Sequence, residues 1–375
     1  MEGNTHKIHN QSTIDKINEF HSNCVQCGKC VKNCMMLQEY CKEPKDFFRS
    51  VEDKKSIEEI IPFSCSLCGK CNLVCPKNLN IEELFMSLRE DMVKDNNGQS
   101  PLKGHGAIHM HQKFSFSSLF SGVVKENEKV ERVFMPGCTL CSYNYDLVLK
   151  TYNYLKDKMP DLGLLIGCCG RPTKDLGEID KFNNNYSKLD TMIKESGAKE
   201  VITACQSCLK TIGEQSDEYE VRSLWTVLKD IGIPEEAKGI GQNSDIEFSI
   251  KDSCASMRNV ELQDSIRQII DDLGYKVKED KERNTGCCGT GGMIHTVNGE
   301  LSQRIMKTNA ENCDSEYTVT YCGGCRNSMI GGGKKSLHIL DLVFNDTWTS
   351  KSSFPHIVGT LKGWINRYKV KSKTR

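Results

Sequence analysis

The sequence predicts an α+β multidomain protein, in which a mainly helical N-terminal domain precedes an α/β unit that occurs twice. The 375-residue chain contains 21 cysteines, and nine of them lie in residues 1–95 among helix-like segments. The other twelve lie between residues 138 and 325, where one cysteine pattern is repeated. Short β-rich runs alternate there with amphipathic stretches, which is typical of parallel sheets covered by helices.

The composition restricts the explanations for so many cysteines. Hydrophobic residues make up 38% and charged residues 27%, and no apolar run has the length of a signal peptide or a membrane span. Disulfide-rich scaffolds are usually small secreted domains, so we expect a cytoplasmic protein with reduced thiols that are free to bind soft metals. Lys plus Arg and Asp plus Glu both total 50, which gives no electrostatic reason to expect nucleic acid as a partner.

Two cysteine runs in the N-terminal part have the spacing C-x2-C-x2-C-x3-C, followed by Met35 in the first run and by Pro76 in the second. Bacterial ferredoxins with two [4Fe–4S] clusters have this spacing, and the fourth cysteine of each run binds the other cluster. CxxC pairs also build zinc sites, but eight cysteines in two such runs favour iron–sulfur clusters. The expected ligands are Cys24, Cys27, Cys30 and Cys75 for cluster 1, and Cys34, Cys65, Cys68 and Cys71 for cluster 2. Gly28 and Gly69 would permit the tight loops.

The remaining N-terminal sequence indicates helices. Residues 35–64, between the two runs, read as helix rather than as the β-hairpin of a small ferredoxin, and so do residues 81–92. We therefore expect residues 1–95 to form a helical ferredoxin-type domain. Residues 96–132 begin with a turn-rich stretch and read as a linker whose aromatic side chains dock on a neighbouring domain. Residues 346–375 are expected to be a basic, solvated C-terminal tail.

The repeated unit spans residues 133–240 and 241–345. The first copy contains Cys138, Cys168-Cys169-Gly170 and Cys205-x2-Cys208, and the second contains Cys254, Cys287-Cys288-Gly289 and Cys322-x2-Cys325. The gaps before the Cys-Cys pairs are 29 and 32 residues, and those after them are 35 and 33 residues. This agreement indicates a duplication.

Each cysteine element is expected at the end of a strand. The predicted strands are Arg132–Met135, Gly163–Gly167, Glu200–Ala204, Ile246–Lys251 and Tyr317–Tyr321, and the predicted helices are Tyr145–Lys158, Ile179–Ser196, Asn259–Leu273 and Gly299–Asn312. In parallel sheets, ligands bind at the carboxyl ends of the strands, so the cysteines fall where a site is expected.

The duplicated half resembles the CCG-domain family, and the whole arrangement resembles the heterodisulfide reductase D subunit, a fusion of C- and B-subunit-like parts. The glycolate oxidase iron–sulfur subunit has a similar order. The resemblance implies a noncubane [4Fe–4S] cluster bound by all five cysteines of each motif. The first set would be Cys138, Cys168, Cys169, Cys205 and Cys208, and the second Cys254, Cys287, Cys288, Cys322 and Cys325. An ordinary cubane or a structural metal at one or both motifs is the alternative.

Three cysteines and one histidine fall outside these sets. Cys141 forms a CxxC with Cys138 and is therefore its rival as a ligand, whereas Cys41 and Cys313 are expected to be small core residues. His295, seven residues after Cys288, is a candidate proton donor near a cluster, although a lone histidine is more often structural.

Two functions follow from these features. In the first, electrons pass through the two cubanes to the paired CCG clusters, which cleave a disulfide or heterodisulfide, as the resemblance implies. In the second, the chain is the electron-transfer subunit of a flavin-dependent glycolate or lactate dehydrogenase. No dinucleotide or phosphate-binding motif occurs, so we expect no flavin in this chain and a flavoprotein or another redox subunit as partner. Peripheral membrane attachment through a cytochrome partner, and quinone as an electron carrier, are left open.

Overall fold

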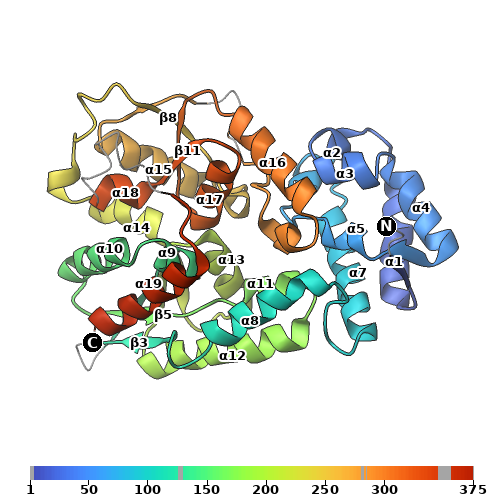
Figure 1. The fold of residues 1–375 in the computed structure, drawn as a ribbon, viewed down its shortest axis with the longest axis horizontal. Coiled ribbons are helices and arrows are strands. Elements are labelled where there is room, and N and C mark those ends of the chain that lie inside the picture. The colour runs from blue at the N-terminus through green and yellow to red at the C-terminus, as the bar shows by residue number, and fades with distance from the viewer. Residues whose placement is uncertain (1–3, 126–129, 280–282, 284, 345–355, 375) are drawn as a thin grey trace. The chain divides into compact units, whose positions relative to one another are not determined.

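The computed structural model describes residues 4–125, 130–279, 283, 285–344 and 356–374 (Figure 1). The chain forms two compact units, each built from segments that are far apart in the sequence. Unit 1 contains residues 1–110, 172–184 and 286–306, and unit 2 contains residues 111–171, 185–285 and 307–375. The domain boundaries drawn from the sequence stay predictions, and two pieces of the repeats pack with the N-terminal helices.

Unit 1 is mainly helical, as the sequence predicts. Its only sheet among the described residues pairs two three-residue strands antiparallel, with Thr5 opposite Glu58. Its elements are β1 (Thr5–Lys7), α1 (Gln11–Asn23), α2 (Lys29–Lys32), α3 (Met35–Tyr40), α4 (Pro44–Lys54), β2 (Ser56–Glu58), α5 (Ile60–Phe63), α6 (Lys70–Leu73), α7 (Ile81–Asp95), η1 (Lys103–His105) and η4 (Gly291–Thr296). Helices α8 (Gly106–Ser115), α11 (Arg171–Asp175), α12 (Ile179–Ser196) and α16 (Gly299–Glu311) have residues in both units.

Helix α7 lies at the centre of unit 1. It begins at Asn80, whose side-chain oxygen accepts from the Glu83 amide at 3.1 Å, and its buried face joins an aromatic core that includes Phe48 and Phe85. Arg89 on this helix has an exposed fraction of 0%. Its guanidinium donates hydrogen bonds to the carbonyl oxygens of the following residues: Pro62, Cys65, Asp175 and Gly292. Arg89 therefore ties α7 to all three segments of unit 1.

Unit 2 contains two sheets with parallel central strands. The first has the order β3-β5-β4-β6-β7, with β3 as an antiparallel edge, and the second has the order β9-β8-β10-β11. The strands are β3 (Gly122–Val124), β4 (Arg132–Met135), β5 (Leu162–Ile166), β6 (Glu200–Thr203), β7 (Glu220–Ser223), β8 (Glu247–Ile250), β9 (Lys276–Val277), β10 (Tyr317–Thr320) and β11 (Lys335–His338). The described part of both repeats thus has one strand order, apart from β3, as expected of a duplication.

The two repeats share one hydrophobic core. Its largest side chain, Trp225 of the first repeat, lies 6.2 Å from the ring of Tyr321 of the second. Helix α14 packs on α15, and the equivalent helices α18 and α10 also pack together. The helices of unit 2 are α9 (Cys138–Tyr143), α10 (Tyr145–Lys158), α13 (Gln206–Gln215), α14 (Leu224–Ile231), η2 (Glu235–Ala237), η3 (Cys254–Ser256), α15 (Val260–Asp272), α17 (Gly323–Gly331), α18 (Ile339–Phe344) and α19 (Thr360–Lys373).

The C-terminal segment differs from the prediction of a solvated tail. Residues 346–355 lie outside the described residues, but α19 is a helix that packs on α9 and buries Asn366, Arg367 and Val370. The solvated-tail prediction is therefore wrong for α19. The aromatic side chains of the predicted linker do find a partner, because the Phe120 ring lies 4.7 Å from that of Trp364. None of the described helices is both long and apolar enough to cross a membrane.

Candidate metal centres

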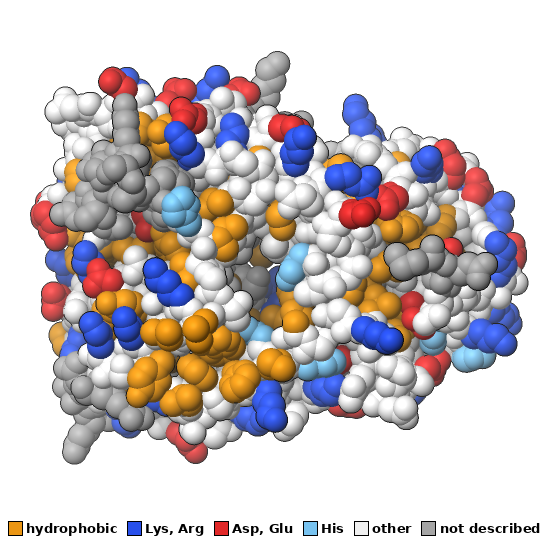
Figure 2. Space-filling view, viewed as in Figure 1, with side chains coloured by type: hydrophobic (Ala, Val, Ile, Leu, Met, Phe, Trp, Pro, Cys, Tyr) orange, Lys and Arg blue, Asp and Glu red, His pale blue; other side chains and the backbone are white. Residues whose placement is uncertain are grey.

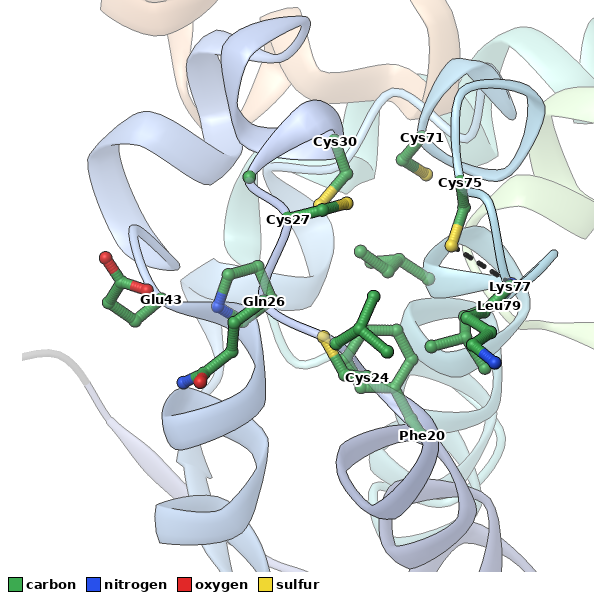
Figure 3. Close-up of a pocket in the computed structure, with 14 residues that line it drawn as sticks. Phe20, Cys24, Gln26, Cys27, Cys30, Glu43, Cys71, Cys75, Lys77 and Leu79 are labelled. Atoms are coloured by element: carbon green, nitrogen blue, oxygen red, sulfur yellow. Dashed lines mark hydrogen bonds between the residues drawn. The ribbon is translucent and has the colours of Figure 1, made fainter.

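The four cysteines predicted for cluster 1 line one hollow in unit 1, with about 480 Å³ of empty space that includes open solvent. The lining also contains Cys71, and Figure 3 shows Cys27 and Cys30 on one side of the space and Cys75 on the other. Cys75 comes from the second run, as the exchange of fourth ligands requires. Cys27 is exposed to solvent, so the hollow opens at the surface.

A second cysteine group in unit 1 contains Cys34, Cys65 and Cys71. Burial raises the pKa of Cys65, and raises that of Cys71 to about 12, while the neighbouring Cys34 thiol adds to both shifts. Cys34 of the first run thus lies close to Cys65 and Cys71 of the second run. Buried thiols of this kind are deprotonated when they bind a metal ion. The grouping matches the predicted exchange, and the ligand assignment itself stays a prediction.

The two cysteine runs have matching loop geometry. Gly28 and Gly69 have φ angles of 70° and 76°, in the left-handed region, and each directly precedes a short helix. Gln26 and Leu67 both have φ of 50° at the equivalent position two residues earlier. Met35 in place of proline after the first run leaves this geometry unchanged.

The first CCG set lies at the carboxyl edge of the first sheet. Cys138 follows β4, the Cys168-Cys169 pair follows β5, and Cys205 and Cys208 follow β6. Gly137, with φ of 84°, allows two of these loops to meet, because a Cβ there would lie 2.8 Å from the Cys205 Cβ. These three strands are neighbours in the sheet, so all five cysteines come to one place, as predicted.

The five thiols of the first set form a continuous chain of contacts. Hydrogen bonds join Cys138 to Cys168, Cys168 to Cys169, Cys169 to Cys208, and Cys208 to Cys205. Donation from Cys168 and Cys208 lowers the pKa of Cys169 to about 5. A cluster of buried thiols in which one ionises this readily suits the binding of a metal cluster.

The rival Cys141 has a different environment. It is 2% exposed within the hydrophobic core, and burial raises its pKa to about 12. Cys41 and Cys313 are also buried in hydrophobic clusters, which confirms the expectation for both. Sequence reasoning missed Gln112, whose side-chain amide lies 3.5 Å from the Cys168 sulfur. No motif marks this glutamine, because it is 56 residues from Cys168 in the sequence.

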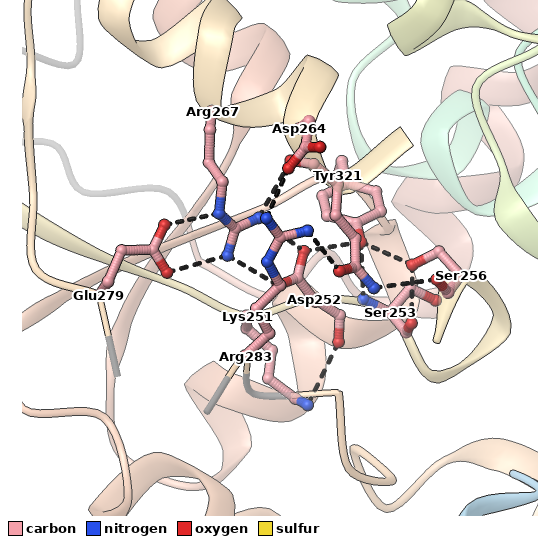
Figure 4. Close-up of polar contacts among 10 residues, drawn as sticks. Lys251, Asp252, Ser253, Ser256, Asp264, Arg267, Glu279, Arg283 and Tyr321 are labelled. Carbon is pink, nitrogen blue, oxygen red and sulfur yellow. Dashed lines mark hydrogen bonds and ion pairs between the residues drawn. The ribbon is translucent and has the colours of Figure 1, made fainter. Parts of the chain in front are cut away.

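The loop that carries Cys254 in the second repeat is fixed by a buried polar network (Figure 4). Asp252 has a side-chain exposed fraction of 0% and pairs with Arg267 at 3.0 Å. The Tyr321 hydroxyl donates to Asp252 at 2.9 Å and lies 2.6 Å from the Ser256 hydroxyl. Because these contacts bracket Cys254 on both sides, the direction of its loop is set by the fold.

The second CCG set is divided between the two units. Cys254, Cys322 and Cys325 belong to unit 2, whereas Cys287 and Cys288 belong to unit 1. Within unit 1, Cys287 forms a side-chain hydrogen bond with Ser66 and packs against the same hydrophobic core as Cys34, Cys65 and Cys71.

The same segment of unit 1 makes close backbone contacts. Gly292 lies against Cys65, since a Cβ at residue 292 would overlap the carbonyl oxygen of Cys65. The His295 side chain interacts electrostatically with the Cys288 thiol, and the residue itself is exposed. The proton-donor role of His295 stays a prediction.

The cysteine-bearing edges of the two repeats meet within unit 2. Helix α9, which begins at Cys138, packs on α17, which contains Cys325. In the equivalent contact, α13, which contains Cys208, packs on η3, which begins at Cys254. A Cβ on Gly323 would lie 2.9 Å from the Thr139 methyl, so the approach is close. The two contacts are equivalent, because α9 and η3 begin at the first cysteine of their repeats and α13 and α17 contain the last.

The described residues contain no group of three His, Cys, Asp or Glu side chains arranged to hold a single metal ion. A four-iron cluster does not require side chains that converge on a single ion, because its cysteines bind separate iron atoms.

Comparison with known proteins defines the class of this chain. The 4Fe-4S dicluster domain matches residues 23–80, and the Cysteine-rich domain matches twice, at residues 133–213 and 250–330. The chain is therefore an iron–sulfur electron-transfer protein with a dicluster domain and two CCG domains, which confirms the predicted class and duplication.

Among its relatives is the D subunit of the dihydromethanophenazine:CoB–CoM heterodisulfide reductase of Methanosarcina mazei. It is 24% identical, and the match covers 86% of this chain and 91% of the relative. The B subunit of the fumarate reductase (CoM/CoB) of Methanothermobacter marburgensis is 20% identical, and the match covers 86% of this chain and 72% of the relative. A crystal structure of a hypothetical protein from Helicobacter pylori shares the fold, with a TM-score of 0.52 and 9% identity over 93% of this chain and 76% of that one. The expected resemblance to the heterodisulfide reductase D subunit is thus confirmed.

Proposed function

We propose that this chain carries electrons through two cubane clusters to two CCG clusters, which together reduce a disulfide. The observation that carries the proposal is the meeting of the two cysteine-bearing edges in unit 2, where α9 packs on α17 and α13 on η3. Electron transfer alone requires no such meeting of two cysteine-bearing edges. The reaction adds two electrons and two protons to R–S–S–R′ and releases RSH and R′SH.

The proposed order of electron transfer follows from unit 1. Cluster 1 would receive electrons, because Cys27 in its hollow is exposed. Cluster 2 would pass them to the second CCG set, because Cys287 lies beside Ser66 and packs against the same core as Cys34. Each iron–sulfur cluster would supply one-electron chemistry. His295, which interacts with Cys288, would supply a proton to a product thiolate.

A redox partner is expected, because the named relatives are subunits of heterodisulfide reductase and fumarate reductase. Apolar side chains gather over α19 and the end of α8 (Figure 2), including Phe114, Leu119, Leu361 and Ile365, which are 45–76% exposed. Exposed apolar groups of this kind often mark surfaces that a partner covers. Peripheral membrane attachment through that partner stays part of the proposal.

The test uses the full chain, purified or reconstituted without oxygen. About sixteen irons per chain are expected, since each of the four proposed clusters contains four. With a reduced low-potential dye, the chain should cleave the CoB–CoM heterodisulfide or another disulfide. Cys208→Ala should abolish turnover, whereas the matched control Cys313→Ala, in a buried cysteine outside the sets, should retain it. About eight irons, or no turnover with any disulfide, would count against the proposal; copurification with a flavoprotein that oxidises lactate or glycolate would then favour the dehydrogenase alternative.

A further inference from the structure

The C-terminal helix α19 brings a buried cation to the first CCG set. The helix lies alongside α9, which begins at Cys138 (Figure 1). The Asn366 amide donates to the Ser142 carbonyl at 2.9 Å and so fixes the two helices together. The next residue, Arg367, is 1% exposed.

The Arg367 guanidinium donates a hydrogen bond from only one of its nitrogens among the described residues. It lies 4.3 Å from the centre of the Trp364 ring, and its Nη1 donates to the Ser115 hydroxyl at 3.0 Å. Its Nε and Nη2 are buried, and neither has a hydrogen-bond partner within the part of the chain that the structure describes. A buried charge without partners is costly unless an opposite charge faces it.

The groups near Arg367 include Cys138 of the first CCG set, and Cys141 and His111 outside that set. The neighbouring residue Asn366 is bonded to Ser142, which lies one helical turn after Cys138 on α9. Ser115 lies one helical turn from Gln112, whose amide contacts the Cys168 sulfur. Two elements that are distant in sequence, α8 and α19, thus bring polar groups to one side of the set. Cys141 belongs to the hydrophobic core, so the negative charge to be balanced is that of the five-cysteine set.

We propose that Arg367 is the counter-ion of the cluster in the first repeat and raises its reduction potential. The inference rests on the proposed function, because it requires a four-iron cluster at these cysteines. Five thiolates give a cluster one more negative charge than the four of a cubane, and reduction adds another. Net charge and hydrogen bonds to sulfur are established determinants of cluster potential. A nearby fixed cation stabilises the reduced form more than the oxidised form. Arg367 is thus a positioning residue that acts through the cluster.

The experiment is an EPR-monitored redox titration of the anaerobic full chain. The signal of the first-repeat cluster is identified as the one that Cys169→Ala removes. Arg367→Gln should make reduction of this cluster at least tenfold less favourable, a shift of about 59 mV or more to lower potential for one electron. Arg367→Lys retains the charge, and its equilibrium constant for reduction of this cluster should remain within threefold of that of the parent chain. Arg367→Met, whose apolar side chain suits the site beside Trp364, provides a second neutral variant if the glutamine variant fails to fold.

A matched control and the iron content separate the possible results. Lys362→Gln removes the same charge from an exposed position on the same helix. It should change the equilibrium constant for reduction of the cluster less than twofold. An unchanged potential in both neutral variants, with the first-repeat signal present, would overturn the role of Arg367. Absence of that signal from the parent chain, with about eight irons per chain, would instead overturn the proposed function.

Discussion

Replacing Arg89 by methionine should strongly destabilise unit 1. The side chain is fully buried, and its guanidinium donates to four backbone carbonyl groups, those of Pro62, Cys65, Asp175 and Gly292. A methionine fills most of the space but supplies no donor. The Pro62 carbonyl keeps the hydrogen bond from the Cys65 amide at 3.2 Å, whereas the carbonyls of Cys65, Asp175 and Gly292 lose the donor that Arg89 supplies.

The magnitude follows from the number of carbonyls. A buried polar group left unsatisfied costs about 1–3 kcal/mol. The three carbonyls that lose their donor would cost at least about 3 kcal/mol and about 6 kcal/mol at the middle of that range, from which the relief of removing a buried charge is subtracted. Burial lowers the Arg89 pKa to about 10, which indicates that the charge does have a desolvation cost. We therefore expect a net loss of about 3–5 kcal/mol for Arg89→Met, and about half of that for Arg89→Lys, which retains three donors.

The assay must report on unit 1 alone. All three tryptophans of the chain lie at or after residue 225, in unit 2, so their fluorescence does not follow unit 1. Hydrogen exchange of peptides from α5 and α7 does follow unit 1. A loss of about 3–5 kcal/mol corresponds to exchange roughly 150- to 5,000-fold faster where these amides exchange by unfolding of the unit. Arg49→Met is the control, because Arg49 is exposed and pairs only weakly with Asp46 at 3.8 Å. Exchange within tenfold of the parent chain in Arg89→Met would refute the reasoning.

Three further changes test other parts of the structure. Cys138→Ala should remove about four irons per chain, whereas Cys141→Ala in the core should remove none; equal iron losses by elemental analysis would contradict the ligand assignment. Gly137→Ala should cost about 1–3 kcal/mol in thermal or urea unfolding, because its Cβ would lie 2.8 Å from that of Cys205; unchanged stability would mean that the loop moves freely. Burial lowers the pKa of His105 to about 3. Below about pH 6.5 the unfolded chain therefore binds a proton at this histidine that the folded chain does not bind, so the free energy of unfolding decreases as the pH is lowered. Between about pH 7.5 and pH 5.5 the loss is about 1.4 kcal/mol, and His105→Phe should reduce the measured pH dependence by that amount.

Periodicity and cysteine spacing predict much of the fold. In the repeats, the strand Arg132–Met135 and the helices Tyr145–Lys158 and Ile179–Ser196 have the predicted bounds, and the other predicted elements differ at their ends by one residue. In the N-terminal part, the helix predicted for residues 81–92 continues to Asp95, and the helical reading of residues 35–64 is wrong at β2, which pairs with β1. The thiols of the first CCG set meet because their strands are neighbours, which the alternation of strands and helices already indicates.

Helix α19 could not be predicted in the same way. The positions that it buries, at helical spacing, are occupied by Gly363, Asn366, Arg367 and Val370, so a search for apolar periodicity finds no buried face. Gln112 and Arg89 are missed for a related reason, since their partners are distant in sequence and are brought close only by tertiary packing. Spacing reveals ligands that share a motif, but it does not reveal the polar groups that surround them.

The composition of unit 1 has a consequence for synthesis on the ribosome. Residues 1–110 contain all eight ferredoxin-type cysteines, but the unit is completed only by residues 172–184 and 286–306. At about 5–20 residues per second, the chain emerges from residue 110 to residue 306 in roughly 10 to 40 seconds. During this interval Arg89 is without its partners at Asp175 and Gly292, so the nascent N-terminal part has its cysteines but not its final packing. A chain truncated before residue 286 would therefore contain all eight of these cysteines but not the completed unit.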